Sequence, residues 1–494
     1  MTTTVPRLMP LAAKNLLVIM SDEHNPRALG AAGHALARTP SLDRLAARGT
    51  RFSAAYCTSP ICVPSRAGFA TGKYPHQIGY WDNADPYDGA VPSWHHLLRS
   101  RGHRVVSIGK LHFRGRPGDD HGFSEELLAM HVLDGIGDVK GLVRQDIPRR
   151  NGYDKLAKLA GPGESPYTRY DRDIAARAQA WLRDEGRRRR ERPWALFVSF
   201  VCPHFPLVAP PEFYAWYPPE RTPLPKQYAK DERPDHPYLR DYDACVAYDL
   251  GFAGEVDKVR RAIAGYLGLV SFMDDNVGSV LAALEDAGLA GDTRVVYTSD
   301  HGDNVGARGL WGKSTMYEES AGVPLILAGP DIAAGSVCPV PVSHVDLFPF
   351  FLESAGCLAP VEGYHGVSPL ALSATDDAGR AVLSEYHAIG STGGITMLRK
   401  GRWKYVHCVR YRPQLFDLEE DPEELVDLAS GPSYLATLRA LDAELRRFCD
   451  PAEVDARAKR RQAELLARYG GRDAALARGD LNYTPAPGQP PDIN

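Results

Sequence analysis

A cysteine with chemically suggestive neighbours stands in the segment Cys62–Arg66, which reads CVPSR. The preceding residues, Thr58–Pro60, are typical of a loop, and Arg66–Gly72 has the character of a short helix start. We therefore expect Cys62 near a helix N-terminus, where free backbone N–H groups favour an anionic substrate. Arg66 adds a fixed positive charge about one helical turn away. The competing interpretation is a buried structural cysteine, the commonest fate of a free thiol.

Acidic and imidazole side chains follow two apolar segments that read as strands. One segment leads into Asp22-Glu23-His24 and the other into Asp300-His301. Such groups at the carboxyl ends of parallel strands are well placed to hold one divalent cation. The oxygen-rich ligand set favours Ca²⁺, Mg²⁺ or Mn²⁺ over a thiolate-type zinc site. Each motif alone is equally consistent with capping of the next helix, but the presence of both favours a metal site.

Short apolar runs that alternate with helix-type sequence must position these side chains. The strand candidates are Asn15–Met20, Val105–Gly109, Trp194–Val201, Arg294–Ser299 and Val323–Ala328. Their continuous apolar character predicts strands that are covered on both faces. Apolar residues also recur in steps of mostly three and four from 259 to 284, and Gly288 follows, which predicts a long helix. The alternation indicates an α/β domain with a mostly parallel sheet.

The pattern changes after about residue 380. Four short strand candidates follow, at Ala381–Tyr386, Ile395–Arg399, Trp403–Val409 and Gln414–Asp417. They predict a small antiparallel sheet, and Ser433–Phe448 predicts a helix after it. The Pro-rich end of the chain is expected to lie across another surface, such as a neighbouring subunit. We therefore divide the chain into a catalytic α/β domain (1–378), a small α+β subdomain (379–450) and a helical, Pro-rich tail (451–494).

The bulk composition excludes several classes of protein. The 58 basic and 62 acidic residues give a net charge of −4, which offers no reason to expect a nucleic-acid or membrane partner. The eight cysteines form no CxxC pair, so zinc-ribbon and thioredoxin-like interpretations fail. Residues 1–13 are too weakly apolar for a secretory signal, and no segment approaches about 18 consecutive apolar residues. We therefore expect a cytoplasmic protein with reduced thiols.

Several motifs, taken together and in order, resemble a known family. They are Thr39–Ala46 (TPSLDRLA), Cys62–Pro75, Gly109–His112 (GKLH), Pro203–Pro206 (PHFP), Thr298–Gly302 (TSDHG) and Gly312-Lys313. From Asn15 to about Asp421 the sequence is similar to type I sulfatases of the alkaline phosphatase superfamily. The resemblance implies an alkaline-phosphatase-like α/β fold, with a large mixed, mostly parallel sheet flanked by helices. A small C-terminal antiparallel sheet with a helix would complete it.

The resemblance also implies a nucleophile and its cofactors. Cys62 would be oxidised to formylglycine by a maturation enzyme, and the hydrated gem-diol would attack sulfur to give a sulfated-enzyme hemiacetal. Collapse of that hemiacetal would expel sulfate, a step that an ordinary Ser or Cys could not perform. One divalent cation, Ca²⁺ or Mn²⁺, would activate the diol. Its ligands would be Asp22, Glu23, the modified residue 62, Asp300 and His301.

The resemblance also implies roles for the remaining matched residues, in transfer of the sulfuryl group and in departure of the alcohol. Arg66, Lys110 and His112 would support the diol and the transferring group. His204 and Lys313 would bind the ester oxygen, and one of them would assist departure of the alcohol. The resemblance thus implies a complete hydrolytic site rather than a nucleophile alone.

Two departures from the commonest sulfatase pattern indicate a subgroup. Asp22-Glu23 replaces the Asp-Asp pair of many members, and Asp300-His301 replaces Asp-Asn. In both features the chain is similar to choline-sulfatase-like and phosphonate-monoesterase-like members. The segments around Asn83 and Glu385 also resemble choline sulfatases, which makes both residues candidates for substrate binding. Glu385 could then face a cationic substrate, or it could equally be a surface carboxylate that ends a strand.

The leading hypothesis is hydrolysis of aryl or alkyl sulfate monoesters, with promiscuity toward phosphonate monoesters and phosphodiesters. One alternative is a phosphonate monoester or phosphodiester hydrolase that uses the same machinery. Another is a non-catalytic anion-binding relic with an unmodified Cys62. The intact set of Lys110, His112, His204 and Lys313 argues against the relic, because a binding module needs no leaving-group catalysis. From the tail we also expect a homodimer or homotetramer.

Overall fold

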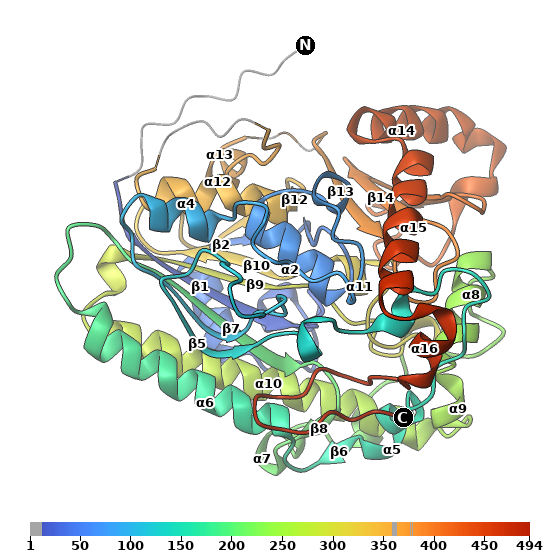
Figure 1. Cartoon of the computed structure of the whole chain (residues 1–494), viewed down its shortest axis with the longest axis horizontal. Helices are drawn as coiled ribbons and strands as arrows, with labels where there is room; N and C mark the ends of the chain where they lie inside the picture. Colours follow the sequence, from blue (N-terminus) through green and yellow to red (C-terminus); the bar gives the residue numbers. More distant parts are fainter. Residues whose placement is uncertain (1–11, 358–362, 376, 378) are drawn as a thin grey trace.

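The computed structural model describes residues 12–357, 363–375, 377 and 379–494. The protein is built on an eight-stranded sheet in the order β11-β2-β10-β9-β1-β7-β4-β5 (Figure 1). These strands are β1 (Asn15–Asp22), β2 (Gly49–Phe52), β4 (Val105–Lys110), β5 (Glu125–Met130), β7 (Ala195–Pro203), β9 (Thr293–Ser299), β10 (Leu325–Ala328) and β11 (Ser336–Cys338). Strands β9, β1, β7, β4 and β5 run parallel, whereas β10 is antiparallel to both neighbours. The predicted mixed, mostly parallel sheet is confirmed.

Helices cover both faces of this sheet, which explains why its central strands are apolar throughout (Figure 1). One face carries α6 (Pro166–Trp181) and α10 (Val256–Asp286), and the other carries α2 (Cys62–Thr71), α4 (Trp94–Ser100) and α12 (His344–Ser354). On β1, alternate side chains join opposite layers. Leu17 and Ile19 pack into the α6/α10 core, and Val18 packs beneath the other helices. Each is fully buried, and such burial contributes about 1.5–3 kcal/mol per side chain.

Helix α10 is the longest in the described part of the chain, with 31 residues. Its bounds enclose the apolar steps predicted from 259 to 284, and Gly288 follows its end at φ 71°. By length and composition alone it could cross a membrane, but 78% of its most apolar stretch is buried inside the protein. It therefore serves as a core helix that packs against β7 and α6.

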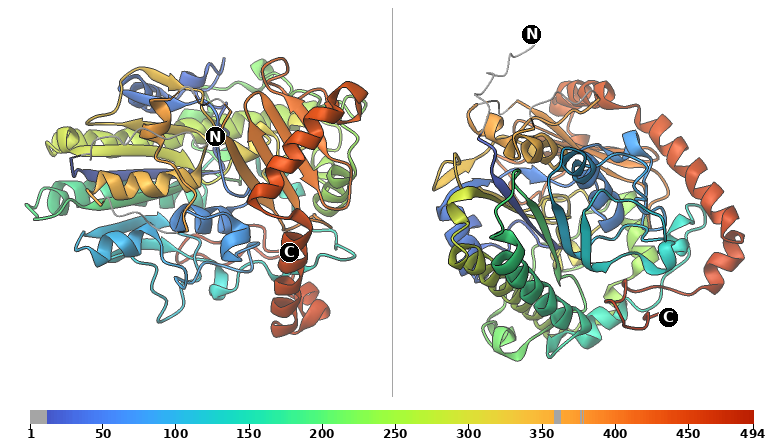
Figure 2. Two further views of the ribbon diagram at one scale, coloured as in Figure 1. Left: turned by 90° about the horizontal axis from the view of Figure 1, so that it is seen from above. Right: turned by 60° about the vertical axis from the view of Figure 1, so that its left-hand side comes forward.

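A second, smaller sheet lies at one end of the large one, in the orange part of Figures 1 and 2. Its antiparallel strands are β13 (Ala381–Tyr386), β14 (Ile395–Lys400), β15 (Trp403–Cys408) and β16 (Gln414–Asp417). Helix α14 (Leu435–Phe448) packs on it through Leu441 and Leu445. The predicted small sheet and helix are thereby confirmed. The domain boundary placed at residue 378 lies outside the described residues, so the three-part division stays a prediction.

The last residues return to the large domain. After α15 (Pro451–Arg468) and α16 (Gly471–Ala477), the chain closes a loop in which Asp480 and Asn494 exchange two backbone hydrogen bonds of 2.8 and 3.0 Å. The side chain of Asp480 also lies 2.6 Å from Lys140 Nζ. Residues 478–494, which we call the C-terminal loop, therefore pack on their own chain. Contact of the tail with a neighbouring subunit stays a prediction.

Candidate active site

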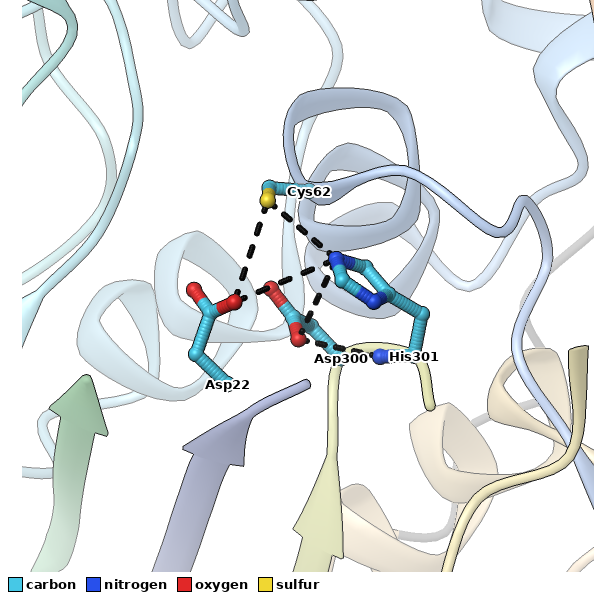
Figure 3. A group of neighbouring side chains, drawn as sticks. All are labelled: Asp22, Cys62, Asp300 and His301. Atoms are coloured by element: carbon cyan, nitrogen blue, oxygen red, sulfur yellow. Dashed lines mark hydrogen bonds and ion pairs between the residues drawn. The ribbon is translucent and has the colours of Figure 1, made fainter. Parts of the chain in front are cut away.

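Strand ends and one helix start converge to form the site. Asp22 ends β1 and Asp300 directly follows β9, the parallel neighbour of β1, so both carboxylates lie at the same edge of the sheet. Cys62 is the first residue of α2, at the helix N-terminus that the sequence predicts. Figure 3 shows the side chains of Asp22, Cys62, Asp300 and His301 pointing toward one another. One atom from each lies within 4.8 Å of the others.

These four side chains have the geometry of a ligand set. Cys62 Sγ lies 3.2 Å from His301 Nε2 and 3.8 Å from Asp22 Oδ1, and His301 Nε2 lies 3.7 Å from Asp300 Oδ1. His301 Nδ1 is 3.0 Å from the Gly302 carbonyl oxygen and donates to it, which leaves Nε2 facing the group. All four residues are at most 1% exposed. Two carboxylates, an imidazole and residue 62 therefore fit a divalent cation that prefers oxygen ligands.

Glu23 adds a carboxyl group next to this set. It lies at φ 69°, and neither of its buried side-chain oxygens has a hydrogen-bond partner among the described residues. Glu23 Oε2 is 3.4 Å from both His204 Nε2 and Lys313 Nζ. Burial raises the pKa of Glu23 to about 8, although Lys313 acts in the opposite direction. A buried carboxyl group with unused acceptors is consistent with a further cation ligand.

Two buried, positively charged side chains hold the carboxylates in place. Arg66 Nε lies 2.8 Å from Asp300 Oδ2, and its Nη2 lies 3.1 Å from Asp22 Oδ2. Lys110 Nζ also contacts Asp22 Oδ2. Burial alone would raise the pKa of Asp22, but Lys110, Arg66 and Lys313 together hold it well below its usual range. Asp22 is therefore ionised. A divalent cation bound in addition to Arg66 and Lys110 would give the pocket enough positive charge to attract an anion.

Lys313 and His204 form a polar pair beside residue 62. Lys313 Nζ is 3.2 Å from Cys62 Sγ and 2.9 Å from His204 Nε2. His204 Nδ1 donates to the Phe205 carbonyl oxygen at 2.7 Å, so His204 Nε2 accepts from Lys313. Burial, assisted by Lys313, holds the pKa of His204 well below its usual range. The pair thus consists of a neutral imidazole and a charged amine.

A cavity opens in front of these groups. Of the four side chains in Figure 3, Cys62 lines it. Aromatic wall residues are Tyr153, Phe205, Tyr242 and Tyr248, and the C-terminal loop contributes Leu481–Thr484. Asp138 and Arg150 form an ion pair of 2.8 Å in the wall. Apart from Phe205, which lies in the motif Pro203–Pro206, the sequence did not single out these wall residues, since most of them lie in segments that follow no periodic pattern.

Asn83 and Glu385, the two residues predicted to bind substrate, differ in whether they line the cavity. Asn83 lines the cavity, and its Oδ1 accepts a hydrogen bond of 3.1 Å from Val63 N near the start of α2. Glu385 does not line the cavity. Its buried carboxylate lies 2.5 Å from His76 Nδ1 and 3.6 Å from His387 Nε2. The structure thus brings Asn83 to the site and places Glu385 in an internal ion pair, so Glu385 is neither substrate-facing nor a surface carboxylate.

The C-terminal loop also contacts the predicted site residue His112. Thr484 Oγ1 lies 2.6 Å from His112 Nε2, and Tyr167 Oη donates to the Thr484 carbonyl oxygen at 2.5 Å. His112 Nδ1 is buried and has no partner among the described residues. Thr484 therefore fixes the orientation of the ring, while Nδ1 remains available to another group.

We expect Thr484→Val to lower kcat/KM about fivefold, because loss of one hydrogen bond costs about 1 kcal/mol. Steady-state kinetics with a sulfate ester would measure the change. Thr484→Ser keeps the hydroxyl and serves as the control, with near-normal kinetics expected. Equal impairment of both variants would mean that the methyl group, rather than the hydrogen bond to His112, is what the site needs.

Comparison with known proteins gives a consistent assignment. Residues 14–357 match the sulfatase family, and residues 306–450 match the C-terminal family of N-sulphoglucosamine sulphohydrolase. Choline-sulfatase of Rhizobium meliloti (strain 1021) is 34% identical over 474 residues, which cover 93% of this chain and 92% of that protein. Arylsulfatase K of Rattus norvegicus is 29% identical over 513 residues, with coverage of 97% and 85%.

A solved structure supports the fold. The phosphonate monoester hydrolase of Agrobacterium radiobacter superposes with a TM-score of 0.71 at 22% identity, covering 97% of this chain and 99% of that one. Similarity at this level of identity shows the fold alone. The family match and the choline-sulfatase relative are what establish kinship and reaction class. The chain belongs to the sulfatase family, with the alkaline-phosphatase-like fold, and is a sulfuric ester hydrolase.

Proposed function

We propose that the chain hydrolyses sulfate monoesters with a formylglycine made from Cys62 and one divalent cation, Ca²⁺ or Mn²⁺. The supporting observation is the position of Cys62 Sγ, 3.2 Å from both His301 Nε2 and Lys313 Nζ. Residue 62 thereby contacts the candidate metal ligands as well as the groups suited to a leaving alcohol, and it lines the cavity. An oxygen attached at this position could be held by both sets and still reach a substrate.

The unmodified thiol is a poor nucleophile at this position. Burial and the nearby Asp22 raise the pKa of Cys62, so the thiol stays protonated at neutral pH. Conversion to formylglycine by a maturation enzyme would replace it with a hydrated aldehyde that presents oxygen nucleophiles. The cation, when bound, supplies positive charge to that oxygen and to the sulfuryl oxygens.

The chain's own residues then orient the substrate and move protons. Arg66 and Lys110 hold Asp22 in place, and Arg66 also holds Asp300. Lys313 carries the charge of the Lys313–His204 pair and is therefore the group that would stabilise or protonate the departing alcohol oxygen. His204 keeps Lys313 aimed at the cavity by accepting its hydrogen bond. This division of roles rests on the hydrogen bond from His204 Nδ1 to Phe205.

Mass spectrometry of the peptide that contains Cys62 is the direct test. Protein from a host with the maturation machinery should carry the aldehyde at residue 62, and chelation should abolish turnover until Ca²⁺ or Mn²⁺ is restored. An unmodified thiol in active protein would eliminate the formylglycine mechanism. An unmodified thiol together with sulfate binding and no turnover would favour a non-catalytic anion-binding relic.

A second candidate is hydrolysis of phosphonate monoesters and phosphodiesters with the same groups, which we expect as a side activity. The positive pocket favours any monoanionic ester, so the site's charge does not separate sulfur from phosphorus substrates. A comparison of kcat/KM for an aryl sulfate, an aryl phosphonate and a phosphate diester would rank the three substrate classes. A preference for phosphorus esters above about a hundredfold, or about 2.7 kcal/mol, would reverse the proposed assignment.

The cellular setting rests on the sequence. We propose a cytoplasmic homodimer or homotetramer in which residues 1–378, 379–450 and 451–494 form the catalytic domain, the subdomain and the tail. Neither nucleic acid nor membrane is proposed as a partner, in line with the net charge of −4. Light scattering of the purified protein would determine the oligomeric state, and a monomer at micromolar concentration would contradict it.

A further inference from the structure

A second group of metal-binding side chains lies at the edge of the large sheet. His121 precedes β5, Glu126 lies within it and His131 follows it. His121 Nδ1 is 2.9 Å from Glu126 Oε1, and His131 Nε2 is 3.2 Å from Glu126 Oε2. One atom from each of the three lies within 4.8 Å of the others. None of the three lines the active-site cavity.

The backbone of β5 departs from regular geometry between Glu126 and His131. Residues five apart on a regular strand point to opposite faces, because side chains alternate. Leu128 has φ 51°, and the pairing of β4 with β5 shifts register between Ile108 and Lys110. Such a bulge resets the alternation and allows both side chains to meet on one side. A left-handed leucine is strained, so the surrounding structure must hold this arrangement in place.

The loop before β5 makes room for the same imidazole. Gly115 has φ 65°, and a Cβ at this position would stand 2.3 Å from His131 Cγ. Any larger residue would displace the His131 ring. Gly115 and the bulge at Leu128 thus both allow the His131 side chain to lie beside Glu126.

The two imidazoles make few other polar contacts. His121 is 4% exposed, and His121 Nε2 and His131 Nδ1 are buried without hydrogen-bond partners among the described residues. The other ring nitrogens face the Glu126 carboxylate, with His121 Nδ1 at 2.9 Å from Oε1 and His131 Nε2 at 3.2 Å from Oε2. Each ring therefore directs one nitrogen at a carboxylate oxygen.

We propose that His121, Glu126 and His131 bind one Zn²⁺, with water as the fourth ligand. Two imidazoles and one carboxylate form a recurrent three-residue zinc ligand set, and their nitrogen and oxygen donors suit this ion better than Ca²⁺. The site is separate from the oxygen-rich group at Asp22 and Asp300. A metal at His131 would steady the segment that carries His112, because the Met130 carbonyl oxygen accepts from His112 N at 2.8 Å.

Calorimetric titration of the full chain with Zn²⁺ tests this site. The titration uses the Cys62→Ser background, which removes the thiol from the active-site group. We expect His131→Gln and Glu126→Gln, each in that background, to bind one equivalent less than the background protein. Zn²⁺ should also raise the melting temperature of the background protein by several degrees more than that of either variant. Co²⁺ should give visible absorption bands that both variants lose.

His365→Gln is the matched control, since His365 is exposed and lies outside the three-residue group. It should leave the zinc stoichiometry unchanged. Equal stoichiometry in the background protein and both cluster variants would overturn the proposal. So would a result in which Glu126→Gln alters the pH dependence of melting while Zn²⁺ changes nothing, because the three residues would then share protons rather than a metal.

Discussion

Cys62→Ala is expected to lower turnover of a sulfate ester by about 10⁴-fold or more, because it removes the nucleophile on which the other groups act. Alanine also removes one of the four candidate metal ligands and a group that lies 3.2 Å from Lys313 Nζ. The loss should appear in kcat, whereas the cavity walls that bind the alcohol remain intact. Single-turnover kinetics with an aryl sulfate would measure the chemical step directly.

Cys57→Ala provides a matched control from the loop that leads into α2. Cys57 is buried, its Sγ lies 3.9 Å from Ser384 Oγ, and burial raises the pKa of its thiol far above the usual range. The variant should keep near-normal kcat with a melting temperature lowered by a few degrees, since it leaves only a small cavity. Retention of full turnover by Cys62→Ala would refute the nucleophile, and equal losses in both variants would point to misfolding.

The closeness of Asp22 and Asp300 could be predicted, because it follows from the direction and pairing of the strands that carry them. Continuous apolar runs predict strands covered on both faces, and parallel neighbours end at one edge of a sheet. Asp22 and Asp300 follow paired parallel strands, β1 and β9, so their convergence needed no knowledge of loops. A helix N-terminus near Cys62 was likewise readable from the local sequence, although α2 begins at Cys62 rather than at the predicted Arg66.

The cavity wall could not be predicted, because it depends on contacts far apart in the sequence. Thr484 meets His112 across 372 positions, within segments that have neither helical nor strand periodicity. Glu385 illustrates the opposite problem. Its place near a strand end suggested an exposed or substrate-facing carboxylate, but β13 packs against the loop at Thr58, and His76 and His387 bury the group. The sequence pattern predicts the strand, whereas tertiary packing decides which of its side chains are buried.

Lys313→Met is expected to slow hydrolysis of an alkyl sulfate by about 10³-fold, within the range for loss of a general acid. An activated aryl sulfate, whose phenolate leaves without a proton, should lose less than about tenfold. The difference arises because Lys313 is the charged member of the Lys313–His204 pair and the amine nearest residue 62. Methionine keeps the length of the side chain, so packing in the cavity changes little. A series of esters with leaving groups of graded pKa would measure the effect as a steeper dependence of log kcat/KM on that pKa.

Two further variants make this result specific to the amine. Lys258→Met removes a lysine on the outer part of α10 whose partner is Glu255, and it should leave the leaving-group dependence unchanged. His204→Leu removes the acceptor that aims Lys313, so it should steepen the dependence in the same direction but less strongly, because the charge remains. If Lys313→Met reduced aryl and alkyl substrates equally, the amine would act on binding of the sulfate group instead. The shared hydrogen bond with His204 would then hold a binding residue in place, and protonation of the alcohol would have to come from solvent.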